Sequence, residues 1–123
     1  MDPQKTYRDY WRCRIIEQQA QQQQSIQQAR RELQRIVDLL VREFGVERII
    51  VFGSLVRGGF TPESDIDLAV AGLPVDAYFT AMAAVNHITE RWVDLKPLED
   101  LHPHFRQRVF ETGEEIYARD LCE

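Results

Sequence analysis

The chain has 123 residues, of which 44% are hydrophobic and 28% charged, a composition typical of one globular domain with its own core. No apolar run approaches the ~20 residues of a membrane-spanning helix, and the N-terminus lacks the apolar stretch of a signal peptide, so we expect a soluble, cytoplasmic protein. Cys13 and Cys122 are too few and too far apart for a disulfide framework or a zinc site, and we expect two unpaired thiols.

The net charge of −5 is unevenly distributed along the chain. Residues 1–48 carry 9 basic and 7 acidic side chains, a net charge of +2, whereas residues 49–123 carry 6 basic and 13 acidic ones, a net charge of −7. Proteins that grip long nucleic acids normally present a basic stripe to the phosphate backbone. The acidic half offers no such stripe, and its clustered aspartates are better suited to divalent cations.

The first predicted element is a helix that begins at Asp2 and Pro3, an N-cap residue followed by proline in the first helical position. It runs into a segment in which six of the seven residues 18–24 are glutamine. That polar segment buries little apolar surface, so it is either a solvated helix, which we favour, or partly disordered.

One face of this helix carries large apolar side chains at helical spacing, namely Tyr7, Tyr10, Trp11 and Ile15. The face either packs on the core of the same domain or forms a docking surface for another chain, and the sequence leaves both interpretations open. From Leu33 onward a regular apolar stripe predicts a helix that packs on the core and ends at Gly45. The stripe consists of Leu33, Ile36, Val37, Leu40, Val41 and Phe44.

After Gly45 the pattern predicts strands and helices in the order of a small α/β or α+β domain. β-branched runs bounded by glycine and proline indicate strands, and longer apolar stripes at helical spacing indicate helices. The predicted elements are a strand over 46–52, a sharp turn over 53–59 that opens a short helix, a strand over 64–71, a helix over 76–90, a strand over 92–95, a short helix over 105–111 and an extended piece over 114–117.

Gly53 and Ser54 directly follow the first predicted strand. A glycine in this position lets the backbone approach a ligand without an intervening Cβ. Backbone amides at a strand-to-helix turn point toward anions and favour phosphate. Taken alone the pair is a weak indication, because Gly-Ser after a strand is commonly only a turn.

Asp65 and Asp67 are alternate residues of the second predicted strand, so their carboxylates lie on the same face of the sheet. Two like charges this close repel each other, and a hard cation such as Mg²⁺ would relieve the repulsion; the alternative is a solvated strand end with two acids. Asp94 in the third predicted strand would join them if the two strands are neighbours. Three carboxylates beside a phosphate-binding turn predict two-metal phosphoryl or nucleotidyl transfer.

The runs Gly53–Gly58 (GSLVRG), Thr61-Pro62 and Ser64–Leu68 (SDIDL) resemble the signature of the DNA polymerase β-type nucleotidyltransferase superfamily. Within it, the sequence is similar to the minimal nucleotidyltransferases (MNT), which are often the antitoxin of a HEPN/MNT toxin–antitoxin pair. The resemblance covers roughly Leu33 to Tyr117. It implies an α/β (α+β) fold of the polymerase β palm type, a small mixed sheet flanked by helices. The chain then divides into an N-terminal helical, Gln-rich extension over residues 1–31 and a minimal nucleotidyltransferase domain over residues 32–123.

The resemblance also implies roles for individual residues of this sequence. The catalytic residues would be three carboxylates that bind two Mg²⁺ ions: Asp65, Asp67 and Asp94. The nucleotide-binding residues, which hold the triphosphate of ATP, would be Gly53, Ser54, Arg57 and Ser64. Arg57 is aimed either at phosphate or at a local acid such as Glu63, and Ser64 is expected to cap or orient its loop.

The activity implied by the resemblance is Mg²⁺-dependent transfer of AMP from ATP to a hydroxyl of a protein partner, in the family a tyrosine of a HEPN ribonuclease toxin. One alternative is an antitoxin that occludes the toxin by binding alone, without catalysis. Another is a transferase for a small molecule such as an aminoglycoside, although those enzymes usually carry an additional helical domain. A minimal domain leaves one side of its cleft open, so we expect a homo- or hetero-oligomer and neither long nucleic acid nor membrane as a partner.

Overall fold

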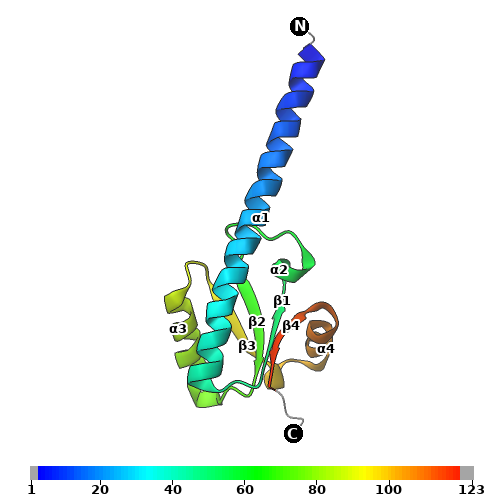
Figure 1. The fold of residues 1–123 in the computed structure, drawn as a ribbon. Helices are drawn as coiled ribbons and strands as arrows, with labels where there is room; N and C mark the ends of the chain where they lie inside the picture. Colours follow the sequence, from blue (N-terminus) through cyan, green and yellow to red (C-terminus); the bar gives the residue numbers. More distant parts are fainter. Residues whose placement is uncertain (1–2, 120–123) are drawn as a thin grey trace.

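The computed structural model describes residues 3–119, with side chains from residue 8 onward, and Figure 1 shows a four-stranded sheet flanked by helices. Every predicted helix and strand is present, with ends that differ by a few residues. The elements are α1 (Pro3–Phe44), β1 (Arg48–Phe52), α2 (Ser54–Arg57), β2 (Ile66–Ala71), η1 (Val75–Ala77), α3 (Tyr78–Ile88), β3 (Val93–Pro97), η2 (Leu98–Asp100), α4 (Pro103–Thr112) and β4 (Glu114–Ala118).

The sheet is mixed, with the strand order β3-β2-β1-β4. β1 lies antiparallel to both β2 and β4, whereas β2 and β3 run parallel. The parallel pair is joined through α3, as expected for two parallel strands that need a helical crossover. The predicted α/β fold with a small mixed sheet is therefore confirmed.

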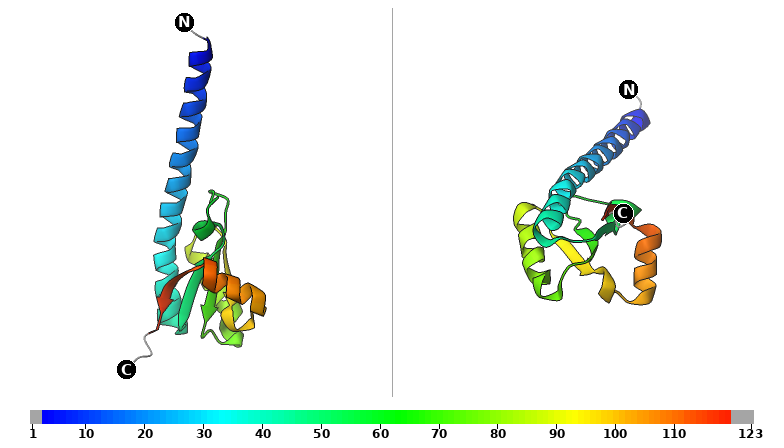
Figure 2. Two further views of the ribbon diagram at one scale, coloured as in Figure 1. Left: turned by 90° about the vertical axis from the view of Figure 1, so that its right-hand side faces the viewer. Right: turned by 60° about the horizontal axis from the view of Figure 1, so that its bottom comes forward.

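The two faces of the sheet are covered differently. One face is packed beneath α1 and α3 and holds the main core, including Ile49, Val51, Ile66, Leu68, Val70, Val93 and Leu95. The other face has a smaller apolar cluster of Ile50, Ala69, Leu98 and Val109, the last contributed by α4. In both views of Figure 2, α1 and α4 lie on opposite sides of the sheet. The smaller cluster leaves part of the second face for polar residues.

The helix α1 has two parts with different surroundings. Residues 8–21 are exposed throughout and extend beyond the sheet, whereas Leu33, Ile36 and Leu40 are at most 3% exposed in the main core. The predicted stripe is thus confirmed, and Gly45 (φ +63°) ends the helix as expected, with its N–H donating to the Val41 carbonyl at 3.2 Å. The polar glutamine run is a solvated helix, which was the favoured interpretation.

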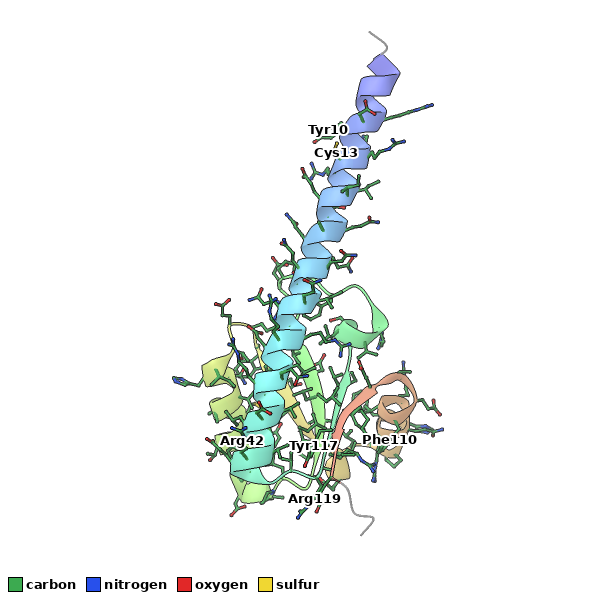
Figure 3. All side chains as sticks on the ribbon, in the orientation of Figure 1. Tyr10, Cys13, Arg42, Phe110, Tyr117 and Arg119 are labelled. Atoms are coloured by element: carbon green, nitrogen blue, oxygen red, sulfur yellow. The ribbon has the colours of Figure 1, made fainter. Side chains whose placement is uncertain are left out.

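The apolar face of the extension does not pack on the core of this chain. Tyr10, Trp11 and Ile15 are 56%, 45% and 51% exposed, so the interpretation that this face joins the domain's own core is wrong for these three residues. Figure 3 shows Tyr10 and the exposed, free thiol of Cys13 on the part of α1 that extends away from the sheet. The side chain of Tyr7, the expected N-cap Asp2 and Cys122 lie outside the described residues.

The proposed boundary between residues 31 and 32 falls inside α1, which continues through it without a break. The division into an extension and a domain therefore stays a prediction. Among residues 3–119, the helices include none with the length and apolar character needed to cross a bilayer.

Candidate active site

The parallel pairing of β2 with β3 sets two aspartates side by side. In the register of the two strands Asp67 is the direct partner of Asp94. Both lie on the face of the sheet opposite the main core, because the buried residues Ile66 and Leu68 flank Asp67 on β2. Asp65 immediately precedes β2, two residues before Asp67, and is exposed. The expectation that the two strands are neighbours is confirmed.

The carboxylates influence one another electrostatically. Burial raises the pKa of Asp67, and the neighbouring charges of Asp94 and Asp65 raise it further, while Lys96 acts in the opposite direction. Lys96 lies on the same face of β3 as Asp94, and its Nζ is 3.1 Å from Asp94 Oδ2. The site thus concentrates negative charge around Asp67, with one lysine as a counterion at its edge.

Gly53 lies directly against Asp67. A Cβ at position 53 would stand 2.4 Å from Asp67 Oδ2, and the backbone there has φ +81°, a conformation that glycine adopts readily. The last residue of β1, Phe52, pairs with Asp67 across the sheet. The sequence analysis related the glycine to a ligand, whereas the structure shows that a side chain at this position would also displace the Asp67 carboxylate from its present place.

Arg57 and Ser64 differ in their surroundings. Arg57, at the end of α2, is exposed and forms no ion pair with Glu63 in the described part of the chain, so the local bridge considered for it is not formed. The Ser64 hydroxyl accepts a hydrogen bond from the Thr61 N–H at 2.9 Å, and the Ser64 N–H donates to the Thr61 carbonyl at 3.0 Å. Ser64 therefore closes the turn that leads into Asp65.

The carboxylates fit magnesium in their chemistry but are not gathered as a finished metal centre. Within residues 3–119 no group of three or more His, Cys, Asp or Glu side chains is placed to hold a metal ion. Mg²⁺ is commonly bound by one or two carboxylates together with waters and substrate phosphates, rather than by a complete protein cage. The half-buried, mutually repelling Asp67 and Asp94 match that kind of site, with a Cβ-free glycine beside them.

Two side chains of α3 that the motif did not identify hold β3 in place. The Asn86 side chain accepts from the Val93 N–H at 2.7 Å and donates to the Val93 carbonyl at 2.9 Å. The Tyr78 hydroxyl donates to the Leu95 carbonyl, and burial and Asp94 raise its pKa. These hydrogen bonds hold the β3 backbone at Val93 and Leu95, the residues on either side of Asp94. In the sequence, Asn86 could have been noticed as a polar residue beside the apolar stripe of the predicted helix, because a polar side chain buried there needs a hydrogen-bond partner.

Arg91 is another residue that the sequence analysis missed. Its Nη1 donates to the Ser64 carbonyl at 2.9 Å, and its Nε lies 3.6 Å from Glu32 Oε2 on α1. Both of these charged side chains are only 9% exposed. A lone arginine in a connecting segment and a glutamate in a helix give no sequence pattern that would pair them.

Comparisons with known proteins concern the family and the fold of this chain. The family described as "Polymerase beta, Nucleotidyltransferase" matches residues 34–121. A solved structure described provisionally as a minimal nucleotidyltransferase is 27% identical, with a TM-score of 0.62 and coverage of 75% of this chain and 94% of that chain. A comparison with curated protein sequences gave no significant match.

Chains from toxin–antitoxin structures are also similar. One, from a mutant of the toxin–antitoxin MntA-HpeT, is 26% identical with a TM-score of 0.60, and the match covers 71% of this chain and 72% of that chain. Another, from a toxin–antitoxin solved with AMP-PNP, is 24% identical with a TM-score of 0.60 and coverage of 70% and 73%, a similarity that shows the fold alone.

Proposed function

This chain belongs to the polymerase beta nucleotidyltransferase family, and on that premise we propose that it transfers AMP from ATP to a hydroxyl group of a protein partner, with Mg²⁺ as cofactor. The observation that carries the proposal is the row formed by Gly53, directly after β1, Asp67 on β2 and Asp94 on β3, in which Asp67 contacts Gly53 and is the register partner of Asp94. Such a row offers one place for phosphate and another for the acceptor.

We further propose that the protein acts as an antitoxin and that the acceptor is a tyrosine of a HEPN ribonuclease toxin. The support is the similarity to chains of toxin–antitoxin structures, one of which is described with AMP-PNP. An enzyme that modifies a large partner needs an accessible site. Asp65 is exposed, and Asp67 and Asp94 are only partly buried, as this role requires.

The residues that would hold Mg²⁺ are Asp65, Asp67 and Asp94. When bound, the metal would neutralise phosphate charge and lower the pKa of the acceptor hydroxyl. Asp67 lies at the centre of the row, and its raised pKa reflects a charge that burial and two neighbouring acids disfavour. A cation bound beside Asp67 would offset both repulsions, from Asp94 and from Asp65, at once.

The polar groups along the row divide between nucleotide and acceptor. Gly53 and Ser54, at the β1 side, would direct backbone amides toward the triphosphate, and the exposed Arg57 would add positive charge there. Asp94, at the β3 side, would orient the acceptor hydroxyl and take its proton at a carboxylate oxygen. The acceptor oxygen bonds to the α-phosphorus, and pyrophosphate leaves with the electrons of the broken P–O bond.

The proposal is tested by incubating the purified protein with α-labelled ATP, Mg²⁺ and the protein encoded by the adjacent reading frame. We expect label on that protein with the wild type and none with the double variant Asp65→Asn/Asp67→Asn. Asp76→Asn is the matched control, because Asp76 lies in η1, outside the site. Equal labelling by the wild type and the double variant, or no labelling at all, contradicts the proposal. Adding an aminoglycoside to the same assay tests the small-molecule alternative.

A second candidate function, neutralisation of the toxin by binding alone, is favoured by the exposed apolar face of α1. Tyr10, Ile15 and Ile16 are 51–57% exposed on the part of the helix that extends beyond the sheet. Clusters of exposed large apolar side chains commonly mark protein-binding surfaces. The double variant Tyr10→Gln/Ile15→Gln, with Gln19→Ala/Gln23→Ala as its control, separates the two functions. Lost neutralisation with retained AMP transfer would support occlusion.

A further inference from the structure

We propose that Arg91 is a positioning residue for Asp65, holding the loop over residues 60–65 so that this carboxylate stays beside Asp67. Arg91 lies in the connection between α3 and β3, and β3 flanks β2 on the side opposite β1. The inference rests on the proposed function, which gives the loop its purpose of placing Asp65 in the active site. The grip of Arg91 on the loop is a separate property that can be measured without any ligand.

The guanidinium of Arg91 contacts the loop in three ways. Its Nη1 donates to the Ser64 carbonyl at 2.9 Å and to the Thr61 carbonyl at 3.4 Å. Its Cζ lies 4.6 Å from the centre of the Phe60 ring, which is itself fully buried. A planar group with several donors is suited to such a combination of stacking and multiple hydrogen bonds, and a lysine ammonium is not.

The two contacts that flank Asp65 come from adjacent residues. Arg91 binds the carbonyl of Ser64, the peptide group directly before Asp65, while the Trp92 carbonyl accepts a hydrogen bond from the Ile66 N–H at 3.0 Å. Asp65 is therefore fixed from both sides by one short segment. These contacts to the two neighbouring residues hold the backbone at Asp65, whose own side chain is exposed.

Glu32 holds Arg91 from the opposite side. The Nε of Arg91 is 3.6 Å from Glu32 Oε2, too long for a hydrogen bond, and that oxygen is buried without a hydrogen-bond partner among the described residues. Burying two charges with incomplete hydrogen bonding contributes little to stability, so an apolar pair would serve the core at least as well. The Glu32–Arg91 pair is better explained by its effect on orientation, because Glu32 turns the Arg91 guanidinium toward the loop over residues 60–65.

Two variants separate positioning from folding. Arg91→Lys keeps a positive charge beside Glu32 but cannot reproduce all the loop contacts. Glu32→Leu/Arg91→Leu removes the buried charges together, which is commonly tolerated by a core, and also releases the loop. The control is Arg48→Lys, because Arg48 forms an exposed ion pair with Glu115 at 3.4 Å, on the far side of the sheet.

The first measurement is hydrogen exchange, without ligand, of the backbone amides of residues 61 and 63–66, since Pro62 has no N–H. The second is Mn²⁺ affinity by electron paramagnetic resonance, with Mn²⁺ as a spectroscopic probe for Mg²⁺. We expect both variants to remain folded, to exchange these amides about tenfold faster and to bind Mn²⁺ about tenfold more weakly, the effect of losing one hydrogen bond to a charged group. Arg48→Lys should match the wild type in both.

The inference is overturned if either folded variant keeps wild-type exchange in residues 61–66, or keeps wild-type Mn²⁺ affinity while exchange accelerates. If Arg91→Lys does not fold, the double leucine variant decides in the same way. A wild type that binds no Mn²⁺ would contradict the proposed function instead, and the exchange experiment would then decide whether Arg91 holds the loop.

Discussion

On β2, neighbouring residues serve opposite faces of the sheet. Ile66 and Leu68 are fully buried beneath α1 and α3, whereas Asp67 between them is partly exposed on the face that α4 covers incompletely. β3 repeats the arrangement, with Val93 and Leu95 buried on either side of Asp94. Because strand residues alternate between faces, one short segment can supply the core and the candidate site independently. Substitutions on the two faces should therefore have separable effects.

The largest expected effect comes from the candidate-site face. Asp67→Asn removes the central carboxylate, and we expect kcat/KM for AMP transfer to fall by about a thousandfold, corresponding to the several kcal/mol that a metal clamp supplies. Thermal unfolding should show no loss of stability without divalent cations, because the substitution removes a charge that its neighbours repel. A variant that is both inactive and strongly destabilised would show that the two faces are not independent.

The opposite outcome is expected one residue further along the strand. Leu68 is completely buried in the main core, so Leu68→Ala should lower the free energy of unfolding by about 2–5 kcal/mol. Chemical denaturation measures this change, and activity per folded molecule at low temperature should stay close to that of the wild type. A thousandfold loss of activity in the folded fraction would mean that core packing sets the geometry of the site.

A smaller, pH-dependent effect on stability further distinguishes the candidate-site face of the sheet from the core face. The pKa of Asp67 is raised above its ordinary value of 3.8 by burial and by Asp94 and Asp65. A raised folded-state pKa stabilises the fold below the unfolded-state value, and this contribution is lost as the pH rises through the folded-state pKa. We therefore expect the wild type to lose stability relative to Asp67→Asn as the pH rises from about 3.8 toward neutrality.

Thermal melts of both proteins across that pH range, without divalent cations, test this expectation. Addition of Mg²⁺ at neutral pH should raise the melting temperature of the wild type more than that of Asp67→Asn, because a bound cation offsets the same repulsion. Parallel pH profiles for the two proteins would show that the charge of Asp67 does not affect folding.

The smallest effect is expected from the exposed part of α1, which belongs to neither face. Removal of residues 1–21 leaves the buried positions from Ser25 onward in place, so the free energy of unfolding should change by less than about 0.5 kcal/mol. Chemical denaturation of the truncated and full-length proteins makes the comparison. A large loss of stability would place the extension within the folding unit and contradict the division near residue 31.

The local sequence pattern was sufficient to predict the strands and the face of the sheet on which their residues lie. Alternation correctly placed Asp67 opposite the apolar residues of β2, whereas Asp65, predicted within the same strand, lies directly before it. The parallel register that sets Asp94 beside Asp67 agrees with the order of the elements. The assigned roles of these residues stay predictions. Arg91 and Glu32 could not be anticipated, because the contact joins residues far apart in sequence and depends on how α1 crosses the sheet.

The fate of the apolar side chains on α1 also depended on tertiary structure. Tyr10 and Leu33 both belong to helical apolar stripes, yet one is exposed and the other buried, because only the later part of the helix lies over the sheet. Periodicity identifies an apolar face but does not say what covers it.

The hydrogen bonds from Asn86 and Tyr78 have a consequence for any polypeptide that reaches the site. β3 is an edge strand, and these side chains occupy the N–H and carbonyl of Val93 and the carbonyl of Leu95 on its outer side. An edge with free backbone groups invites a foreign strand to add to the sheet. These hydrogen bonds obstruct such β-augmentation at Val93 and Leu95, so a polypeptide that reaches Asp94 is expected to approach from above the open face, as a protruding loop or helix end.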